Sequence, residues 1–582
     1  MTDARLPLGR PLLAGGLVLV TALATACTPR AGGGSEGTAA APRGELTVLS
    51  LGPVATWDPQ RMSISPDVAF AGRVFLRTLT AFPPGRDAAA QRSVVGDLAT
   101  GPGTPDKDHK VWTYRLRDGV RWQDGSPLTC EDVRYGVSRS FAEPMASEGL
   151  NYPAAYLDLP RKADGTPAYA GPWAKDAKGQ AAYDKAVTCQ GPTITFHLAA
   201  PVVEFDQVVT SPAFAPVKKD QDKGPKGGTY AVFSSGPYQL KGDWDPSSGG
   251  TFVRNPKWDK ASDPIRKGLP DTIRYVEGTE SQTAVQQVLA DDPEHRQTVT
   301  LDPAPPALQQ SILSDSGLRA RSINPSSQFV DYLAPNVAKG VMRDQRVRRA
   351  LALATNREGY VTALGGESAA DVAYGLIGPA LPGHTDADPT GAGRSGDPAA
   401  ARAALQQAGL TLPVRIRVAY RSTPTADKAM AALTNGWEDA GFAVTLQPIE
   451  KDYFTAIGAP GRQDQTDVFW ANWAASWPSA STVIPPLFDS RLNLLASSSG
   501  RDYGRFADDR VNAEITRIGT LTDADQRAAA WARLDAGLAQ RGAFVALAQR
   551  RSLYVAGSRV TGFAANEALG GFVDLADVGV RQ

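Results

Sequence analysis

The sequence predicts an α/β protein with more than one domain, and three observations support this prediction. The chain has 582 residues, which is too long for one ordinary domain and allows roughly two to four. It is 42% hydrophobic and 21% charged, so it can bury substantial cores. After residue 397, stretches with helical spacing alternate with short stretches with strand spacing, as in parallel sheets covered by helices.

The charges of the chain balance. Lys and Arg together number 61, Asp and Glu together number 61, and the formal net charge is zero. A strong positive excess would indicate nucleic acid or an acidic surface as the partner. We therefore expect no nucleic acid partner.

The N-terminus has the pattern of an export signal. Arg5 and Arg10 form a short basic region before an apolar stretch at residues 12–20, which is too short to span a bilayer. Small residues then lead to Cys27, which resembles a bacterial lipoprotein signal, although Ala24 stands where such signals usually have Leu. The resemblance implies cleavage before Cys27 and a lipid on its sulfur. Plain secretion with an incidental cysteine is the alternative.

The residues after Cys27 are predicted to form a flexible tether. Residues 28–44 are rich in Gly, Ala, Ser and Pro, a composition typical of flexible linkers. No later stretch is apolar enough to be predicted as a membrane-spanning helix.

Cys130 and Cys189 are the two cysteines left once Cys27 is assigned to a lipid. An exported chain folds in a compartment that permits disulfides, so we expect the two to be joined. Two free buried thiols are the alternative.

The first elements are strands and helices with clear patterns. Residues 45–50 are apolar on both faces, which predicts a buried strand. Residues 68–79 have helical spacing, and residues 111–116 alternate as a strand. Thr129 and Asp132 form a capping box, which predicts that a helix begins there.

The middle of the chain continues in the same manner. Residues 194–198 alternate as a strand, and Asp344 is a predicted N-cap of the helix that follows it. We expect Arg346, Arg348 and Arg349 to lie on the solvated face of that helix.

The clearest α/β pattern begins near residue 397. A helix at 398–408, a strand at 414–418, a helix around 430–437 and a strand from 444 follow one another. This spacing predicts a parallel strand pair joined by a right-handed crossover. Ligands of such sheets bind beyond the carboxyl ends of the strands.

The last elements close the fold. Thr522 and Asp525 form a second predicted capping box, and the helix after it buries Trp531. Residues 543–547 and 552–555 are predicted strands.

Residues 469–479 are the stretch that we expect to contact a ligand. Trp470, Trp473 and Trp477 are three of the chain's 11 tryptophans, and small residues separate them. A strand is predicted to end near Trp470, so the run would form a loop of exposed indoles, which give stiff and amphipathic contact area. Core filling is the alternative, because Trp is usually buried.

Four stretches carry a family resemblance. They are residues 112–133, Gly236-Pro237-Tyr238 together with Arg254-Asn255-Pro256, residues 343–357, and residues 397–409. Each is weak alone. Their order over about 500 residues of an exported chain resembles the family-5 extracytoplasmic solute-binding proteins, the peptide, dipeptide and nickel binding subunits of ABC importers.

The resemblance implies an α/β, two-lobed fold like that of the periplasmic binding proteins, in the class with an extra domain, with a hinge between the lobes. The predicted boundaries are 1–27 for the lipoprotein signal peptide, 28–44 for the tether, 45–80 for the first part of lobe I, 81–227 for its extra domain, 228–317 for its second part, 318–547 for lobe II and 548–582 for the return to lobe I.

The resemblance also implies a function without catalysis. A peptide or peptide-like solute would be enclosed as the lobes close, and the closed form would be offered to an ABC permease with its ATPase subunits. The protein would be an extracytoplasmic monomer held at the membrane by its lipid. No cofactor and no metal are implied.

In peptide-binding relatives, a Trp-x-x-Asp element holds the α-amino group of the ligand through a charge-assisted hydrogen bond. The matching positions here are Trp473 and Ser476, so the tryptophan is present and the acid is absent. A hydroxyl cannot neutralise an ammonium group. A capped peptide, a sugar-containing solute or another neutral ligand therefore becomes a competing expectation.

Six residues are the candidate ligand contacts. Trp473 and Trp477 lead, Ser476 and Asn472 are polar candidates, and Trp470 is either a contact or a core residue. Trp57 follows the first strand, where relatives also contact ligand, and a packing role is the equal alternative.

Three other functions compete with import. A hydrolase finds little support, because the chain has no HExxH pattern and no G-x-S-x-G elbow between a predicted strand and a predicted helix. A nickel binder is the second competitor. Binding of the bare ion would need a His/Cys cluster, which the sequence does not show, whereas a metal held in a small chelator would need none. A ligand-sensing receptor lipoprotein is indistinguishable from an importer subunit by sequence.

Overall fold

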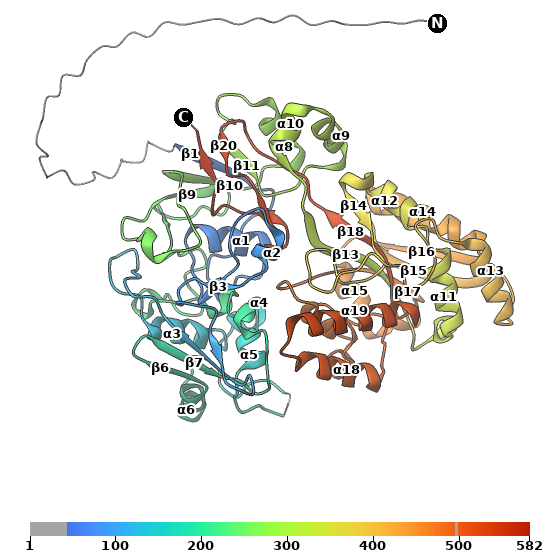
Figure 1. The fold of residues 1–582 in the computed structure, drawn as a ribbon, viewed down its shortest axis with the longest axis horizontal. Coiled ribbons are helices and arrows are strands. Elements are labelled where there is room, and N and C mark those ends of the chain that lie inside the picture. Colours follow the sequence, from blue (N-terminus) through green and yellow to red (C-terminus); the bar gives the residue numbers. More distant parts are fainter. Residues whose placement is uncertain (1–43, 164, 495–498, 582) are drawn as a thin grey trace, which may run out of the picture. The chain divides into compact units, whose positions relative to one another are not determined.

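The computed structural model describes residues 44–163, 165–494 and 499–581, and the largest sheets within these segments have five, four and six strands (Figure 1). The predicted signal peptide, the lipidated Cys27 and all of the tether before Gly44 lie outside the described residues. Within the described segments, no helix is both long and apolar enough to cross a membrane.

The five-stranded sheet forms around the first predicted strand. β1 (Glu45–Leu49) is confirmed as buried and pairs in parallel with two neighbours, because apolar side chains on both of its faces find cover there. The order across the sheet is β11 (Thr298–Thr300), β1, β10 (Thr272–Val276), β9 (Gly249–Arg254) and β8 (Tyr238–Leu240).

α1 (Ser65–Val74) covers part of this region but differs from the predicted 68–79. It begins earlier, with Pro66 in its first turn, where the missing N–H costs no hydrogen bond. It ends at Val74, because Phe75 turns out of the helix and stacks on Phe252 in the core.

The four-stranded sheet carries the disulfide. Cys130 and Cys189 are joined, which ties the start of α3 (Cys130–Arg139) to an edge strand. The capping box of Thr129 and Asp132 is confirmed at the N-terminus of α3. The strands are, in order, β4 (Thr104–Pro105), β5 (Val111–Arg115), β7 (Thr193–His197) and β6 (Val187–Gln190).

The six-stranded sheet contains the predicted parallel pair. β15 (Val414–Arg421) pairs in parallel with β16 (Phe442–Ile449), starting with Val414 opposite Phe442. The helix before the pair and the helix between its strands are α13 (Pro398–Gln407) and α14 (Pro424–Asp439). The order is β14 (Ala370–Val372), β18 (Val545–Arg551), β13 (Ser326–Pro335), β17 (Val468–Ala474), β15 and β16.

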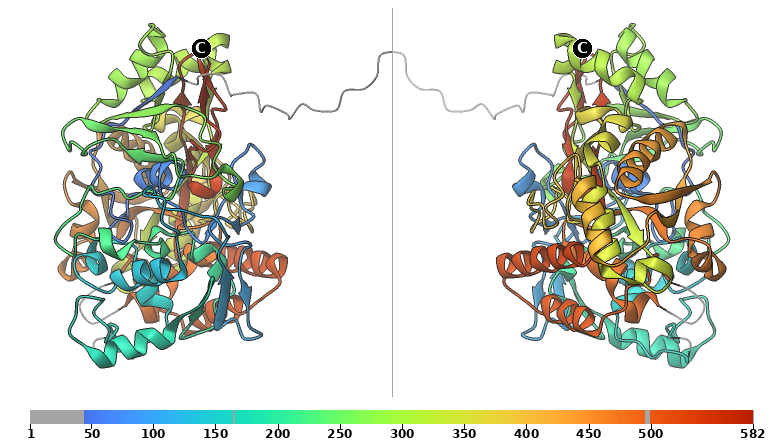
Figure 2. Two further views of the ribbon diagram at one scale, coloured as in Figure 1. Left: turned by 90° about the vertical axis from the view of Figure 1, so that its left-hand side faces the viewer. Right: turned by 90° about the vertical axis from the view of Figure 1, so that its right-hand side faces the viewer.

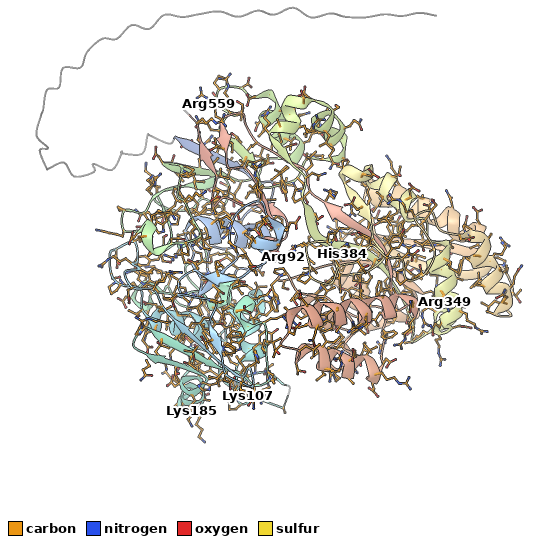
Figure 3. All side chains as sticks on the ribbon, viewed as in Figure 1. Arg92, Lys107, Lys185, Arg349, His384 and Arg559 are labelled. Atoms are coloured by element: carbon orange, nitrogen blue, oxygen red, sulfur yellow. A yellow bond between two sulfur atoms is a disulfide. The ribbon has the colours of Figure 1, made fainter. Side chains whose placement is uncertain are left out.

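One arginine of α11 (Gln345–Ala354) is placed differently from the prediction. Asp344 caps this helix as expected, and Arg349 lies on its outer side (Figure 3). Arg348, however, is only 6% exposed, and its guanidinium donates to the carbonyl oxygens of Met342, Gly542 and Arg541. The charge can be buried there because backbone oxygens before α11 and just after α19 (Ala524–Gln540) accept its hydrogen bonds.

α19 (Ala524–Gln540) begins one residue later than the capping box implied. The carboxylate of Asp523 accepts from the backbone N–H of Gln526, so Asp523 is the N-cap and Thr522 is not. Trp531 is buried as predicted. The remaining longer helices are α6 (Ala177–Ala186), α8 (Ser281–Ala290), α9 (Pro306–Ser314), α12 (Arg357–Leu364) and α18 (Asp509–Gly519).

The sheets belong to two lobes. Lobe I contains the five-stranded and four-stranded sheets, and lobe II contains the six-stranded sheet, each with its own buried apolar cluster. After β18 the chain leaves lobe II, and residues such as Tyr554, Leu575 and Val578 pack into the core of lobe I. Figure 1 shows β13 and β18 side by side where the chain passes between the lobes, and Figure 2 shows α8 and α9 at one end in two further views.

Candidate functional site

The tryptophan run lies mostly inside the sheet of lobe II. β17 carries Trp470 and Trp473 and pairs antiparallel with β13 along its whole length, from Val468 opposite Pro335 to Ala474 opposite Phe329. The prediction of a strand that ends near Trp470 and a loop of exposed indoles is therefore wrong. The backbone pairing with β13 extends the strand, and none of the three indoles is exposed.

Trp470 is a core residue. Its side chain is 8% exposed, and its Nε1 donates to the hydroxyl of Tyr360 at 2.9 Å. That hydroxyl donates in turn to the fully buried carboxylate of Asp331, which also pairs with Arg550 at 2.7 Å. Of the two alternatives for Trp470, the structure favours core filling.

Trp473 is half-buried at the end of β17. Its Nε1 donates to the carbonyl oxygen of Thr482 at 2.8 Å, and the guanidinium of Arg501 lies 5.9 Å from its ring. The indole is therefore held in place by the segment that follows the tryptophan run. It borders a small space together with Trp477, beside the larger cavity described below.

Trp477 reaches from lobe II into lobe I. It is 7% exposed and packs within the apolar cluster of the four-stranded sheet. Its ring meets that of Tyr152 edge to face, with centroids 5.3 Å apart. Tyr152 belongs to α5 (Tyr152–Tyr156), so one indole connects the two lobes.

A cavity of about 290 Å³ lies beside this contact. One wall is built by α1, by Leu150 and Tyr152 at the start of α5, and by α7 (Phe205–Val208) with the turn after it, all in lobe I. The other wall is the Ala474–Trp477 segment of lobe II. Gln328 of β13 also lines it and donates to Ser65 at 3.4 Å, so polar side chains of both lobes meet at its edge.

The wall is mainly neutral. Hydroxyl and amide groups alternate with apolar and aromatic side chains, and Ser476 is exposed there. Burial raises the pKa of the Tyr152 hydroxyl, and a hydrogen bond with Ser476 opposes this shift, so the phenol stays protonated at neutral pH. Such a wall offers hydrogen bonds without charge.

A second contact joins the lobes beside the cavity. Glu204, which precedes α7, is 7% exposed. Its carboxylate accepts from the hydroxyls of Ser479 at 2.9 Å and Ser481 at 2.6 Å, and from Nε of Arg527 at 2.9 Å. All three donors belong to lobe II.

Two candidates lie away from the cavity. Trp57 is 0% exposed, and its ring packs against those of Phe70, Phe75 and Trp244 in the core of lobe I. The packing alternative therefore describes its position, although it also borders a separate cavity of about 170 Å³ within lobe I. Asn472 of β17 is half-buried and lies opposite Asp331 of β13. It is not part of the cavity wall.

Several wall residues were not identified from the sequence. Tyr152 and Gln328 had no motif to mark them, because a wall assembled from distant segments leaves no local pattern. Gly72 carried a weak signal, since an isolated glycine inside a helical pattern often has a packing reason. A Cβ at Gly72 would meet nothing within 4 Å, which fits its place beside the cavity.

Metal ligation finds no support in the described part of the chain. No group of three or more His, Cys, Asp or Glu side chains in these segments is arranged to hold an ion.

Comparisons with known proteins agree on the family. The protein-family model described as bacterial extracellular solute-binding proteins, family 5 Middle, matches residues 93–493. The solved structure of clavulanic acid biosynthesis oligopeptide binding protein 2 is 28% identical, with a TM-score of 0.83, and the alignment covers 93% of this chain and 96% of that one.

Two curated relatives from Escherichia coli K12 are named for different solutes. The periplasmic murein peptide-binding protein MppA is 25% identical over 466 residues, which cover 75% of this chain and 77% of the relative. The probable deoxycholate-binding periplasmic protein YgiS is also 25% identical, over 451 residues that cover 72% of this chain and 73% of the relative.

Proposed function

Because the chain belongs to the family-5 bacterial extracellular solute-binding proteins, we propose that it captures a peptide or peptide-like solute between its lobes and delivers it to an ABC permease. The observation that carries this proposal is the cavity of about 290 Å³ between α1 of lobe I and the Ala474–Trp477 segment of lobe II. A solute there touches both lobes and therefore favours the arrangement that brings them together.

A peptide is the leading solute class for two reasons. The names of two relatives describe a murein peptide-binding and an oligopeptide-binding protein. The wall also offers hydroxyl and amide groups, which suit the N–H and C=O groups of a peptide backbone, next to the aromatic rings of Phe82, Tyr152 and Trp477.

A non-peptide solute is the second candidate. Ser476 stands where peptide-binding relatives are expected to have an acid, and one relative is named for deoxycholate. An oligosaccharide would also suit the aromatic rings and hydroxyl groups of the wall. A metal bound in a small chelate would need no protein ligand cluster.

The rest of the proposal concerns the setting of the protein. We propose that Cys27 carries a lipid, that residues 28–44 tether the lobes to the membrane, and that the monomer has no catalytic activity. The domain boundaries predicted from the sequence remain part of this proposal. Genes for two permeases and two ATPases beside its gene would favour import over a sensory role.

The test is a solute panel on protein expressed from residue 28 onward, followed by tryptophan fluorescence and melting temperature. The panel contains free-amine peptides, N-capped peptides, oligosaccharides, and nickel with and without chelators. A specific solute at a hundredfold excess over its Kd stabilises the fold by about 2.7 kcal/mol, which gives a clear rise in Tm. A rise with peptides supports the proposal, and a rise with only the other classes contradicts its peptide part.

A further inference from the structure

The charged residues on the wall of the cavity between the lobes are already neutralised. Among the described residues that line it, Arg73 and Arg266 are the ones that carry a charge at neutral pH. They are 5% and 1% exposed, so neither offers its charge freely to a bound molecule.

Arg266 has no donor left for a solute. Its Nε donates to the carbonyl oxygen of Gly72, its Nη1 to Asp97 and Asp263, and its Nη2 to Asp97 and the carbonyl oxygen of Leu76. A guanidinium has five N–H donors, and these bonds use all of them.

Arg73 is neutralised in a similar way. Its Nε and Nη2 donate to the two oxygens of Asp574 at 2.8 and 2.9 Å, a bidentate ion pair with both side chains buried. Nη2 also donates to the carbonyl oxygen of Phe82. The pair as a whole brings no net charge to the wall.

We infer that the cavity takes a solute whose enclosed part is uncharged, such as a peptide blocked at its amino end, and selects against a free ammonium group. Removing an ammonium group from water is costly unless a carboxylate meets it, and the wall offers only neutral oxygens for that purpose. The inference rests on the proposed function, because it takes this cavity as the solute site.

Ser476 is the position at which this selectivity can be changed. It is exposed on the wall, on the lobe II side, and it hydrogen-bonds with Tyr152 of lobe I. Ser476→Asp would add a carboxylate to the wall without a cationic partner, whereas Ser476→Asn has nearly the same size and no charge. Comparing the two variants therefore distinguishes the effect of the added charge from the effect of the added volume.

The test uses two tripeptides that differ by one charge, Ala-Phe-Ala-amide with a free amino end and N-acetyl-Ala-Phe-Ala-amide. Isothermal titration gives the Kd of each for the protein and both variants. We expect the acetylated form to bind at least about tenfold tighter to the protein and to Ser476→Asn, which is about 1.4 kcal/mol. Ser476→Asp should reduce that ratio about tenfold or more, because it binds the free amine better.

The outcomes separate this inference from the proposed function. If the free-amine peptide binds the protein as tightly as the acetylated one, the inference is overturned and peptide capture stands. If neither tripeptide binds but neutral maltotriose does, peptide capture fails and the uncharged class is supported. If only the bare nickel ion of the panel binds, both fail.

Discussion

Trp477 is a side chain that couples the two lobes directly. It leaves lobe II after β17, yet it is buried in the apolar cluster of lobe I and meets Tyr152 edge to face. It also lines the cavity. A residue with all three properties should influence affinity for a solute more than a tryptophan of the same strand that lies in the core.

The first prediction compares these two tryptophans. We expect Trp477→Ala to weaken solute binding by about tenfold, because an aromatic contact worth about 0.5–1.5 kcal/mol and the apolar area around it are lost. Trp470→Phe is the control, since it loses the hydrogen bond to Tyr360 and some ring volume in the core, away from the cavity, and should lower Tm without changing Kd. Equal losses of affinity in both variants, measured by titration with the best solute of the panel, would contradict this role.

The second prediction concerns Asp67 in α1. Burial raises the pKa of this carboxyl to about 7, against 3.8 for the exposed group. The folded state therefore holds a proton that the unfolded state loses between about pH 4 and 7, so stability falls as pH rises through that window and the penalty is complete above it. The penalty is at most about 4 kcal/mol.

Asp67→Asn removes the ionisation. We expect the variant to have a higher Tm than the protein at pH 8 and nearly the same Tm at pH 4, in thermal unfolding scans at both values. A Tm difference that stays constant between pH 4 and 8 would show that the carboxyl does not titrate in this way.

Among the helices and strands, the sequence predicted the features that residues close together in the chain determine. The capping box at Thr129, the cap at Asp344 and the parallel pairing of β15 with β16 follow from residues close in sequence. The extent of β17 does not, because its pairing with β13 comes from a segment more than a hundred residues earlier. Arg348 was misassigned for the same reason, since carbonyl groups near Gly542 accept its hydrogen bonds.

The same contrast, between residues close in sequence and residues that the fold brings together, applies to the candidate site. Ser476 and Trp477 could be selected because one run of sequence contains them, and Trp473 of the same run lies beside the cavity and not on its wall. Tyr152, Gln328 and the Arg73–Asp574 pair could not, since they come from segments that only the fold brings together. Trp57 followed a predicted strand, but its aromatic neighbours at Phe70 and Trp244 bury it.

The third prediction tests the disulfide between α3 and β6, which closes a loop of 59 residues. We expect Cys130→Ala combined with Cys189→Ala to lower the free energy of unfolding by about 2–4 kcal/mol, because the unfolded chain gains freedom. Solute affinity should be unchanged, since neither cysteine lines the cavity. Denaturant unfolding and titration measure the two effects, and unchanged stability would contradict the assigned role.

At the scale of the whole molecule, the fold provides two kinds of contact between the lobes beside the cavity. Trp477 provides an apolar contact, and Glu204 provides a polar one through Ser479, Ser481 and Arg527. A solute in the cavity adds its own contacts to these. Weakening the polar contact should therefore lower the affinity for a solute that needs both lobes.

The fourth prediction is that Glu204→Gln weakens solute binding about fivefold or more, because Arg527 then lies near a neutral amide instead of a carboxylate. Glu148→Gln is the matched control, since Glu148 is about half exposed and pairs with Arg61 within lobe I. Titration of both variants with the same solute checks this. Equal affinities for the two variants would mean that Glu204 does not couple the lobes.

Whether a solute binds between the lobes is tested most directly by filling the cavity and measuring the Tm rise caused by the best solute of the panel. Gly72→Leu places a side chain where a Cβ meets nothing within 4 Å, on the cavity wall, and Gly537→Leu does the same in α19, away from that wall. Leucine is also the better helix former at both positions. We expect addition of the solute to raise the Tm of the unmodified protein and of Gly537→Leu. Addition of the solute should not change the Tm of Gly72→Leu. An undiminished Tm rise in Gly72→Leu would show that the solute binds elsewhere and not in the cavity between the lobes.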